Sequence, residues 1–240
     1  MTGLNLGTTY YLRAFATNAS GTAYGNEQTF TTTAITPTST DIDGNTYNTV
    51  QIGSQVWMSE NLKTSRYRNG GSIPYVVGNT EWQALTTGAW SYYNHDEANN
   101  AIYGKLYNWY TTQGDTLCPT GWHVPSDTEW TILTTYLGGE SVAGGKMKYI
   151  GTAYWNGPNT DATNESGFSA LPGGYRNNNG QFYSALQNMH TFFWSTSETI
   201  TSSRVHYRGL YHTSGAVDNG GSALLNGNKT EGASIRCLKD

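Results

Sequence analysis

The chain contains 240 residues, of which 12% are charged, and its formal net charge at pH 7 is −4. Nucleic-acid-binding proteins usually present a basic face, and membrane-spanning helices need about 18 consecutive apolar residues, so we expect neither a nucleic-acid partner nor a membrane span. Low charge, with many Asn and Tyr and few Lys, indicates an extracellular or cell-surface location.

Residues 1–33 differ from the rest of the chain. The stretch "TTYYLRAFATNASGTAYGNEQTFTTT" has two alternating runs around the turn "NASGTAYG", which predicts a β-hairpin. It resembles the last two strands of a fibronectin type III-like module. We therefore interpret 1–33 as the remnant of such a module, and "AITPTSTD" at 34–41 as a linker.

Residues 42–240 are expected to form the main domain. The stretch "TYNTVQIGSQVWM" has strand-forming residues on both sides of a Gly-Ser pair, which predicts a hairpin. The stretch "YGKLYNWYTT" at 103–112 places Leu, Trp and Tyr on one helical face, which predicts a short helix. Ser126 and Glu129 fit a capping box, and the second helix should end at the glycines 138–139.

Short β-like runs follow in the later part of the chain. They are "GFSAL", "QFYSAL", "TFFWST", "RVHYRGLYH" and "ASIRCL". The segments between them are rich in Gly and Asn, which is typical of loops. Two short helices followed by many short strands predict an α+β fold with long irregular loops.

Several segments of the main domain, taken in order, carry a family resemblance. They are "VQIGSQVWMSENLK", "YGKLYNWY", "CPTGWHVPSDTEW", "SGFSALPGGYR", "FFWSTSE" and "SIRCLKD". This order resembles the Fibrobacter succinogenes major paralogous domain family, which is common on secreted Bacteroidetes and Fibrobacteres proteins. That family in turn is similar to the formylglycine-generating-enzyme branch of the C-type-lectin-like fold. The resemblance implies a C-type-lectin-like fold with two short helices, a small twisted antiparallel sheet and long loops.

The chain has two cysteines, Cys118 and Cys237. The sequence alone leaves open whether they meet. Formylglycine-generating enzymes depend on a copper-binding cysteine pair late in the fold, and these two cysteines lie at other places. The resemblance therefore implies a structural disulfide between them, and no oxidase activity.

The stretch "HVPSDTEW" contains His123, Asp127 and Glu129, which an enzyme could use for proton transfer. Local structure explains the same residues, because Glu129 caps its own helix and Asp127 favours the helix N-terminus. We expect His123 to be a packing residue. No motif for a nucleophile or a phosphate loop is present, so no catalytic residues are predicted.

One loop carries hard oxygen donors that suit calcium. The candidate ligands in "WNGPNTDATNESGF" are Asn156, Asn159, Asp161, Asn164 and Glu165. Asn and Asp also favour turns, and the spacing matches no known calcium loop. We expect no other cofactor, with structural calcium as the one option.

Residues 194–233 mix small residues with Tyr, His, Arg, Asp and Asn, as recognition surfaces do. The predicted ligand-binding residues are Trp194 at the base of the surface, and His206, Tyr207, Arg208, Tyr211, His212, Asp218 and Asn219. Variable proteins of diversity-generating retroelements have the same C-type-lectin-like fold and carry their hypervariable residues in the corresponding late segment. The resemblance therefore implies that this chain could be such a variable protein. The alternative is an ordinary loop rich in Asn and Gly.

These observations together favour a non-catalytic, secreted or cell-surface module that binds a protein or glycan ligand on a cell surface. Two alternatives stay open: a carbohydrate-active or cell-wall-associated enzyme domain, and a structural adhesin or spacer. A cleft with two carboxylates about 5–10 Å apart would favour the enzyme.

Overall fold

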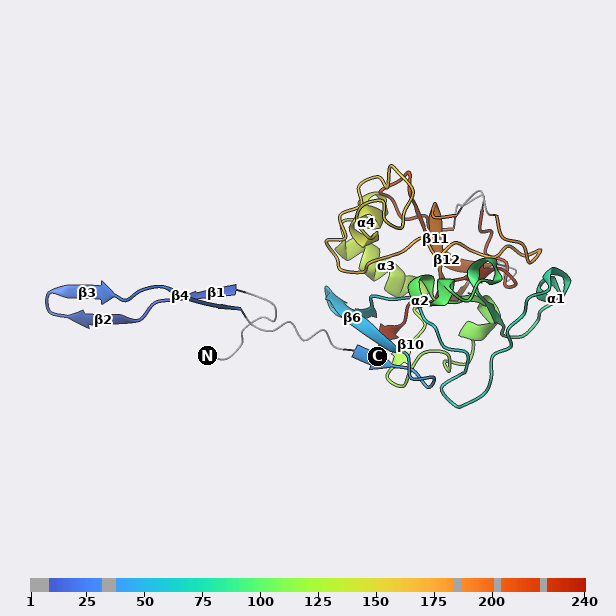
Figure 1. The fold of residues 1–240 in the computed structure, drawn as a ribbon, viewed down its shortest axis with the longest axis horizontal. Helices are drawn as coiled ribbons and strands as arrows, with labels where there is room; N and C mark the ends of the chain where they lie inside the picture. The colour runs from blue at the N-terminus through green and yellow to red at the C-terminus, as the bar shows by residue number, and fades with distance from the viewer. Residues whose placement is uncertain (1–8, 32–37, 184–186, 201–203, 221–223) are drawn as a thin grey trace. The chain divides into compact units, whose positions relative to one another are not determined.

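The computed structural model describes residues 9–31, 38–183, 187–200, 204–220 and 224–240. The chain divides into two compact units, Met1–Pro37 and Thr38–Asp240 (Figure 1). Parts of the predicted module remnant and linker, and the end of the predicted run "QFYSAL", lie outside the described residues.

The first unit contains the predicted hairpin. Its strands are β1 (Thr9–Leu12), β2 (Phe15–Asn18), β3 (Gly21–Tyr24) and β4 (Gln28–Thr31), with β1 antiparallel to β4 and β2 antiparallel to β3. Tyr11, Phe15 and Tyr24 are each about two-thirds exposed, at 67%, 70% and 67%. Two strands alone have marginal stability. The likeness to a fibronectin type III-like module stays a prediction.

A five-stranded antiparallel sheet organises the second unit. Its order is β10 (Trp122–His123), β14 (Leu238–Lys239), β7 (Gln55–Met58), β6 (Thr46–Ile52) and β5 (Thr38–Thr40). The β6–β7 pair is the hairpin that the sequence predicts. Strand β5 falls in the predicted linker, because the second compact unit begins at Thr38.

Two smaller antiparallel sheets carry the rest of the strands. One contains β8 (Trp90–Ser91), β9 (Leu106–Asn108) and β13 (Gly232–Ala233), and the other contains β11 (His190–Glu198) and β12 (Val205–Tyr211). The run "GFSAL" forms an isolated bridge at Ala170 rather than a strand. The run "ASIRCL" is divided between β13 and β14, which lie in different sheets.

The helices are short. They are α1 (Asn79–Gln83), α2 (Asn99–Tyr103), α3 (Asp127–Tyr136) and α4 (Glu140–Met147), with 3-10 turns η1 (Tyr93–His95) and η2 (Trp109–Thr112). Helix α3 begins at the predicted capping box, which is complete. No helix of the described part is long and apolar enough to cross a membrane. The outcome is a mixed fold of few short helices and mostly antiparallel sheets.

The helix predicted over 103–112 is wrong. Residues 106–108 form β9, which pairs with β8 on one side and β13 on the other, and the 3-10 turn η2 follows. Tyr107 and Trp109 are both buried. In an amphipathic helix, one of the two faces of this segment would be exposed to solvent. Pairing on both edges overrides the helical spacing of the apolar residues.

Two aromatic clusters form the core. In one, the rings of Trp57 and Trp130 have centroids 4.6 Å apart, and Phe168 and Phe193 pack against Trp130. Trp130 lies on α3, so the amphipathic face of that helix is anchored to β7 and β11. The other cluster surrounds the two cysteines.

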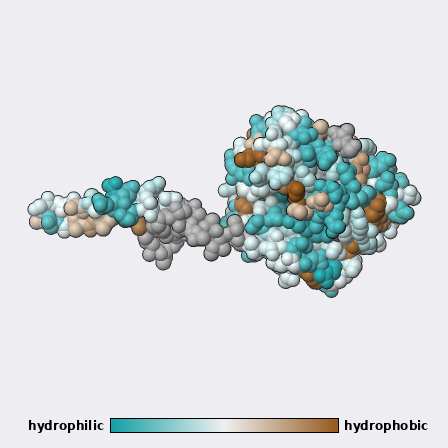
Figure 2. Space-filling model, viewed as in Figure 1, coloured by the Kyte–Doolittle hydropathy of each residue, from teal (hydrophilic) through white to brown (hydrophobic). Residues whose placement is uncertain are grey.

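Hydrophilic residues cover most of the face in Figure 2, with hydrophobic ones in small separate patches.

Buried cations hold the irregular loops in place. The Lys148 ammonium donates to the carbonyls of Thr160, Tyr211 and Ser214, and the Arg176 guanidinium donates to those of Val76, Val77, Gly78 and Gly180. Backbone carbonyls outside sheets and helices must find donors when they are buried. Burial lowers the pKa of Lys148 to about 8 and that of Arg176 to about 10. Cationic side chains thus replace regular backbone pairing here.

Candidate functional site

Three of the predicted ligand-binding residues belong to the interior. Trp194, Tyr207 and Arg208 are at most 1% exposed. The Trp194 indole donates to the Tyr107 carbonyl at 2.8 Å, and the Tyr207 hydroxyl donates to the Leu225 carbonyl at 2.7 Å. Side chains this deep cannot meet a surface ligand, so we remove them from the contact set.

Arg208 shows why the mixture of residue types in this segment did not predict an exposed surface. Its guanidinium donates to the Asp127 carboxylate at 2.7 Å at the start of α3, while Tyr207 on the opposite face of β12 packs on Phe192. Both faces of β12 are therefore covered. Alternating aromatic and charged residues here mark a strand buried on both sides, rather than one with a free face.

The other predicted contact residues reach the surface at different elements. His206 lies 3.4 Å from the Asp127 carboxylate, and the Tyr211 hydroxyl donates to Asp218 at 3.3 Å. The His212 ring is hydrogen-bonded to the Gly157 carbonyl, and the Asn219 amide donates to Glu140 on α4. The predicted contact residues therefore lie against three separate elements: His206 at the start of α3, His212 at the Gly157 loop and Asn219 at α4.

The predicted calcium ligands are committed to turns. Asn159 donates to the Tyr149 and Gly151 carbonyls, and Asn164 exchanges two hydrogen bonds with Ser169. Positive φ angles, which Asn and Asp tolerate, occur at Asn159, Asp161 and Asn164.

The other two candidates have partners of their own. Asn156 donates to the Gln187 carbonyl, and Glu165 forms an ion pair with Lys146 at 2.9 Å. Across the described residues, no group of three or more His, Cys, Asp or Glu is placed to hold a metal ion. Turns and these two contacts occupy four of the five residues, and structural calcium stays a prediction.

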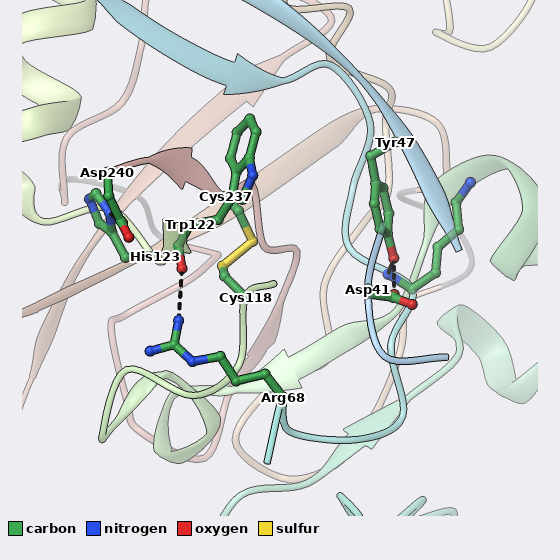
Figure 3. The surroundings of a disulfide bond; sticks show 9 residues. Asp41, Tyr47, Arg68, Cys118, Trp122, His123, Cys237 and Asp240 are labelled. Atoms are coloured by element: carbon green, nitrogen blue, oxygen red, sulfur yellow. Dashed lines mark hydrogen bonds and ion pairs between the residues drawn. A yellow bond between two sulfur atoms is a disulfide. The ribbon is translucent and has the colours of Figure 1, made fainter. Parts of the chain in front are cut away.

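The disulfide between Cys118 and Cys237 is present (Figure 3). It joins the segment before β10 to the residue before β14, two strands that also pair with each other. The closed loop spans 119 positions, so the cross-link removes much of the unfolded chain's freedom.

His123 lies beside this disulfide, between two carboxylates. Its Nδ1 is 2.7 Å from Asp240 and its Nε2 is 2.9 Å from Glu129, and Figure 3 shows the Asp240 side chain beside the ring. Burial lowers the pKa of His123, but the hydrogen bonds to Asp240 and Glu129 outweigh burial, so the pKa is raised. Only an imidazolium can donate to both carboxylates.

A cavity of about 400 Å³ opens next to His123 and Glu129. Glu129 is not free to act as a base there, because its second oxygen accepts from the backbone and hydroxyl of Ser126. Burial raises the pKa of Glu129, but these hydrogen bonds and His123 outweigh it, so the pKa is lowered. The interpretation of Glu129 as a helix cap agrees with this geometry.

A second polar hollow, of about 280 Å³, lies elsewhere, and we call it the Tyr183 hollow. It lies between the segment that follows Gly174 and the one that precedes β13. Its lining residues are Tyr175, Asn177, Asn178, Asn179, Tyr183, Leu224, Asn226 and Glu231. Amides and two tyrosine rings therefore dominate the lining.

Tyr183 is held at both ends, although 45% of it is exposed. The Asn177 amide donates to the Tyr183 hydroxyl at 3.1 Å. The Tyr183 backbone carbonyl accepts from the Tyr93 hydroxyl at 3.4 Å. The buried ring of Tyr175 lies behind it, with centroids 6.2 Å apart. An exposed aromatic ring fixed in this way is a preformed contact surface.

The wall of the Tyr183 hollow is a tight turn over residues 177–181. The Asn177 backbone and side chain bond the backbone of Gln181, and the Gly180 amide donates back to Asn177. Gly180 has a φ of 78°, and a Cβ there would lie 2.6 Å from the Asn79 backbone. Glycine is needed for this turn to pack against the start of α1.

Glu231 forms the floor of the hollow and is 1% exposed. Its carboxylate accepts the backbone N–H groups of Asn226 and Asn228 at 3.2 and 2.9 Å. Burial raises the pKa of Glu231 despite these hydrogen bonds. This carboxyl group shapes the 226–231 turn, and it is the only acidic group among the described lining residues.

None of the residues predicted to bind a ligand lines this hollow. Its signal was present in "YRNNNGQFY", where three Asn and a Gly precede an aromatic pair. Asn also recurs in other loops of this chain, such as "WNGPNTDATNESGF", so composition alone could not mark it as a site. The aromatic residue that follows such a turn is the more useful indicator.

Comparison with known proteins bears on the second unit. A search of curated proteins found no match to the chain, and a search of solved structures found none either. The family model described as the Fibrobacter succinogenes major domain matches residues 50–239, which include the four helices, the strands from β7 onward and the Tyr183 hollow. The chain therefore belongs to the Fibrobacter succinogenes major domain family.

Proposed function

We propose that this chain is a non-catalytic ligand-binding module of a secreted or cell-surface protein, built on a C-type-lectin-like fold, and that the Tyr183 hollow is its recognition site. The observation that supports the proposal most strongly is the Tyr183 ring. The ring is exposed, yet the Asn177 amide donates to its hydroxyl, and the Tyr93 hydroxyl donates to the Tyr183 backbone carbonyl. A restrained aromatic ring loses little entropy when a ligand binds.

The chemistry of the lining favours binding over catalysis. Glycoside hydrolysis usually needs two carboxyl groups that flank the scissile bond. The described lining of the hollow offers one, Glu231, whose oxygens already accept backbone N–H groups. Amide side chains both donate and accept hydrogen bonds, which suits recognition of a polar protein or glycan ligand.

The late segment adds a second set of accessible residues to this proposal. His206, His212 and Asn219 keep side chains that are at least partly accessible, whereas Tyr207 and Gly209 are buried. If related copies are diversified by a retroelement, we propose that the accessible positions vary and the buried ones do not. A Cβ at Gly209 would lie 2.8 Å from the Phe192 ring, which leaves no room for variation.

A binding comparison tests the proposal. Wild-type protein and Tyr183→Ala are applied to arrays of glycans and of purified cell-surface proteins. Truncating a central aromatic anchor typically costs about 2 kcal/mol, so we expect affinity to fall about 30-fold. The matched control is Tyr136→Ala, which removes another exposed tyrosine, 65% accessible, from α3. The site is refuted if every ligand of the wild type binds Tyr183→Ala equally well.

A further inference from the structure

A second hollow, of about 420 Å³, also has Tyr183 in its lining. We call it the Phe182 hollow. Its lining residues are Asn79, Asn94, His95, Gln181, Phe182 and Tyr183. Tyr183 lines both hollows, so they are adjacent at this residue.

The lining of the second hollow is again aromatic and amide. The rings of His95 and Phe182 lie edge to face with centroids 5.0 Å apart, and Phe182 packs on Tyr93 in the same way. Burial, and to a lesser extent the charge of Arg176, lowers the pKa of His95. A lowered pKa favours the neutral imidazole, which can serve as a polar, uncharged contact.

Arg176, which bonds the 177–181 turn from the interior, is not accessible to a ligand. Arg176 is fully buried, its guanidinium is 4.2 Å from the Trp82 ring centroid, and its N–H groups donate to Gly180 and to the 76–78 backbone. No Lys or Arg is present in the described lining of either hollow. An anionic group such as a phosphate or sulfate would find no charge to pair with.

The pairing of rings and amides does match a neutral sugar. A pyranose presents apolar C–H faces that pack on aromatic rings, and hydroxyl groups at its rim that both donate and accept hydrogen bonds. Tyr183 and Phe182 supply rings, while Asn226 and Asn178 on one side and Gln181 and Asn94 on the other supply amides. Each hollow repeats this combination.

We infer that the two hollows form one extended site for a neutral glycan of at least two sugar units, with Tyr183 at the junction between the units. The inference rests on the proposed function, because it names the ligand class of the same site. It adds a requirement on chain length, since each hollow holds its own unit. Affinity should therefore rise from the monosaccharide to the di- and trisaccharide and then level off.

Isothermal titration with gluco-, xylo- and manno-oligosaccharides of one to six units tests the inference. Oligogalacturonates of the same lengths are the acidic probes. Asn226→Ala changes the Tyr183 hollow, and Gln181→Ala changes the Phe182 hollow. We expect each substitution to weaken trisaccharide binding about tenfold, while only one of them affects the monosaccharide. Tyr183→Ala should abolish the dependence on length, and Tyr136→Ala should leave it unchanged.

The outcomes separate the inference from the proposed function. If all neutral series fail to bind, or if the acidic probes bind more tightly, the inference is overturned. If a protein ligand from the arrays still depends on Tyr183 in that case, the proposed function stands. Equal affinity for one and three units would also overturn the extended site. Unfolding midpoints of all variants within about 2 °C of wild type exclude misfolding as the cause.

Discussion

Replacing the buried Arg236 by Met should cost the protein a large part of its stability. The Arg236 guanidinium is 1% exposed and donates to the Asn61 side chain and to the carbonyls of Met58, Phe168 and Ser169. These contacts join β7 to the loop that carries Phe168 and Ser169. Methionine fills a similar volume but leaves the four acceptors without this donor.

The expected loss follows from those acceptors. A buried acceptor without a donor costs about 1–3 kcal/mol, and the smallest value for each gives about 4 kcal/mol. We use the smallest value for each acceptor because the substitution also removes a buried positive charge. That charge is costly to bury, since burial lowers the pKa of Arg236 to about 9. The free energy of unfolding is measured by urea titration with tryptophan fluorescence.

A matched control and a milder variant sharpen the test. Arg204→Met replaces an exposed arginine and should change the unfolding free energy by less than about 0.5 kcal/mol. Arg236→Lys keeps the charge with fewer donors and should fall between wild type and Arg236→Met. A loss below about 1 kcal/mol for Arg236→Met would show that the buried cation does not hold these loops, and would refute the reasoning.

Three further predictions concern the disulfide, His123 and β12. Replacing both Cys118 and Cys237 by Ser should lower the unfolding free energy by about 3–5 kcal/mol in urea titrations, and an unchanged midpoint would contradict the structural role. The raised pKa of His123 predicts stability that is fully present below its unfolded pKa and is lost as pH rises through the folded pKa. The stability difference between wild type and His123→Gln should therefore shrink between pH 5 and pH 8, and a difference that grows with pH would be the wrong sign. Gly209→Ala should lower the melting temperature by several degrees, because its Cβ would lie 2.8 Å from the Phe192 ring, while His206→Ala should shift it by less than about 2 °C.

Local signals in the sequence predicted the local structure well. The capping box at Ser126 gave the start of α3, and the glycines after it gave its end. The β6–β7 hairpin followed from strand formers around a Gly-Ser turn. In each case neighbours in sequence are also the interacting partners, so residue types alone carry the information.

Long-range partners decided the features that the sequence missed. Leu106 and Trp109 have helical spacing, but pairing of β9 with β8 and β13 makes the segment a strand. Arg208 looks like a surface residue until Asp127, 81 positions earlier, is seen to accept its hydrogen bond. The Tyr183 hollow requires the 177–181 turn to meet the 224–231 segment, and nothing in either segment predicts that meeting.

The central claim is that ligands bind at the Tyr183 hollow and not on the late segment alone. The most direct measurement is the change in backbone amide chemical shifts when the labelled protein is titrated with a neutral tetrasaccharide of the gluco, xylo or manno series. We predict that the largest changes fall within residues 175–183 and 224–231, together with 79 and 94–95. Changes confined to 204–220, or no change with any of the three probes, would contradict the account.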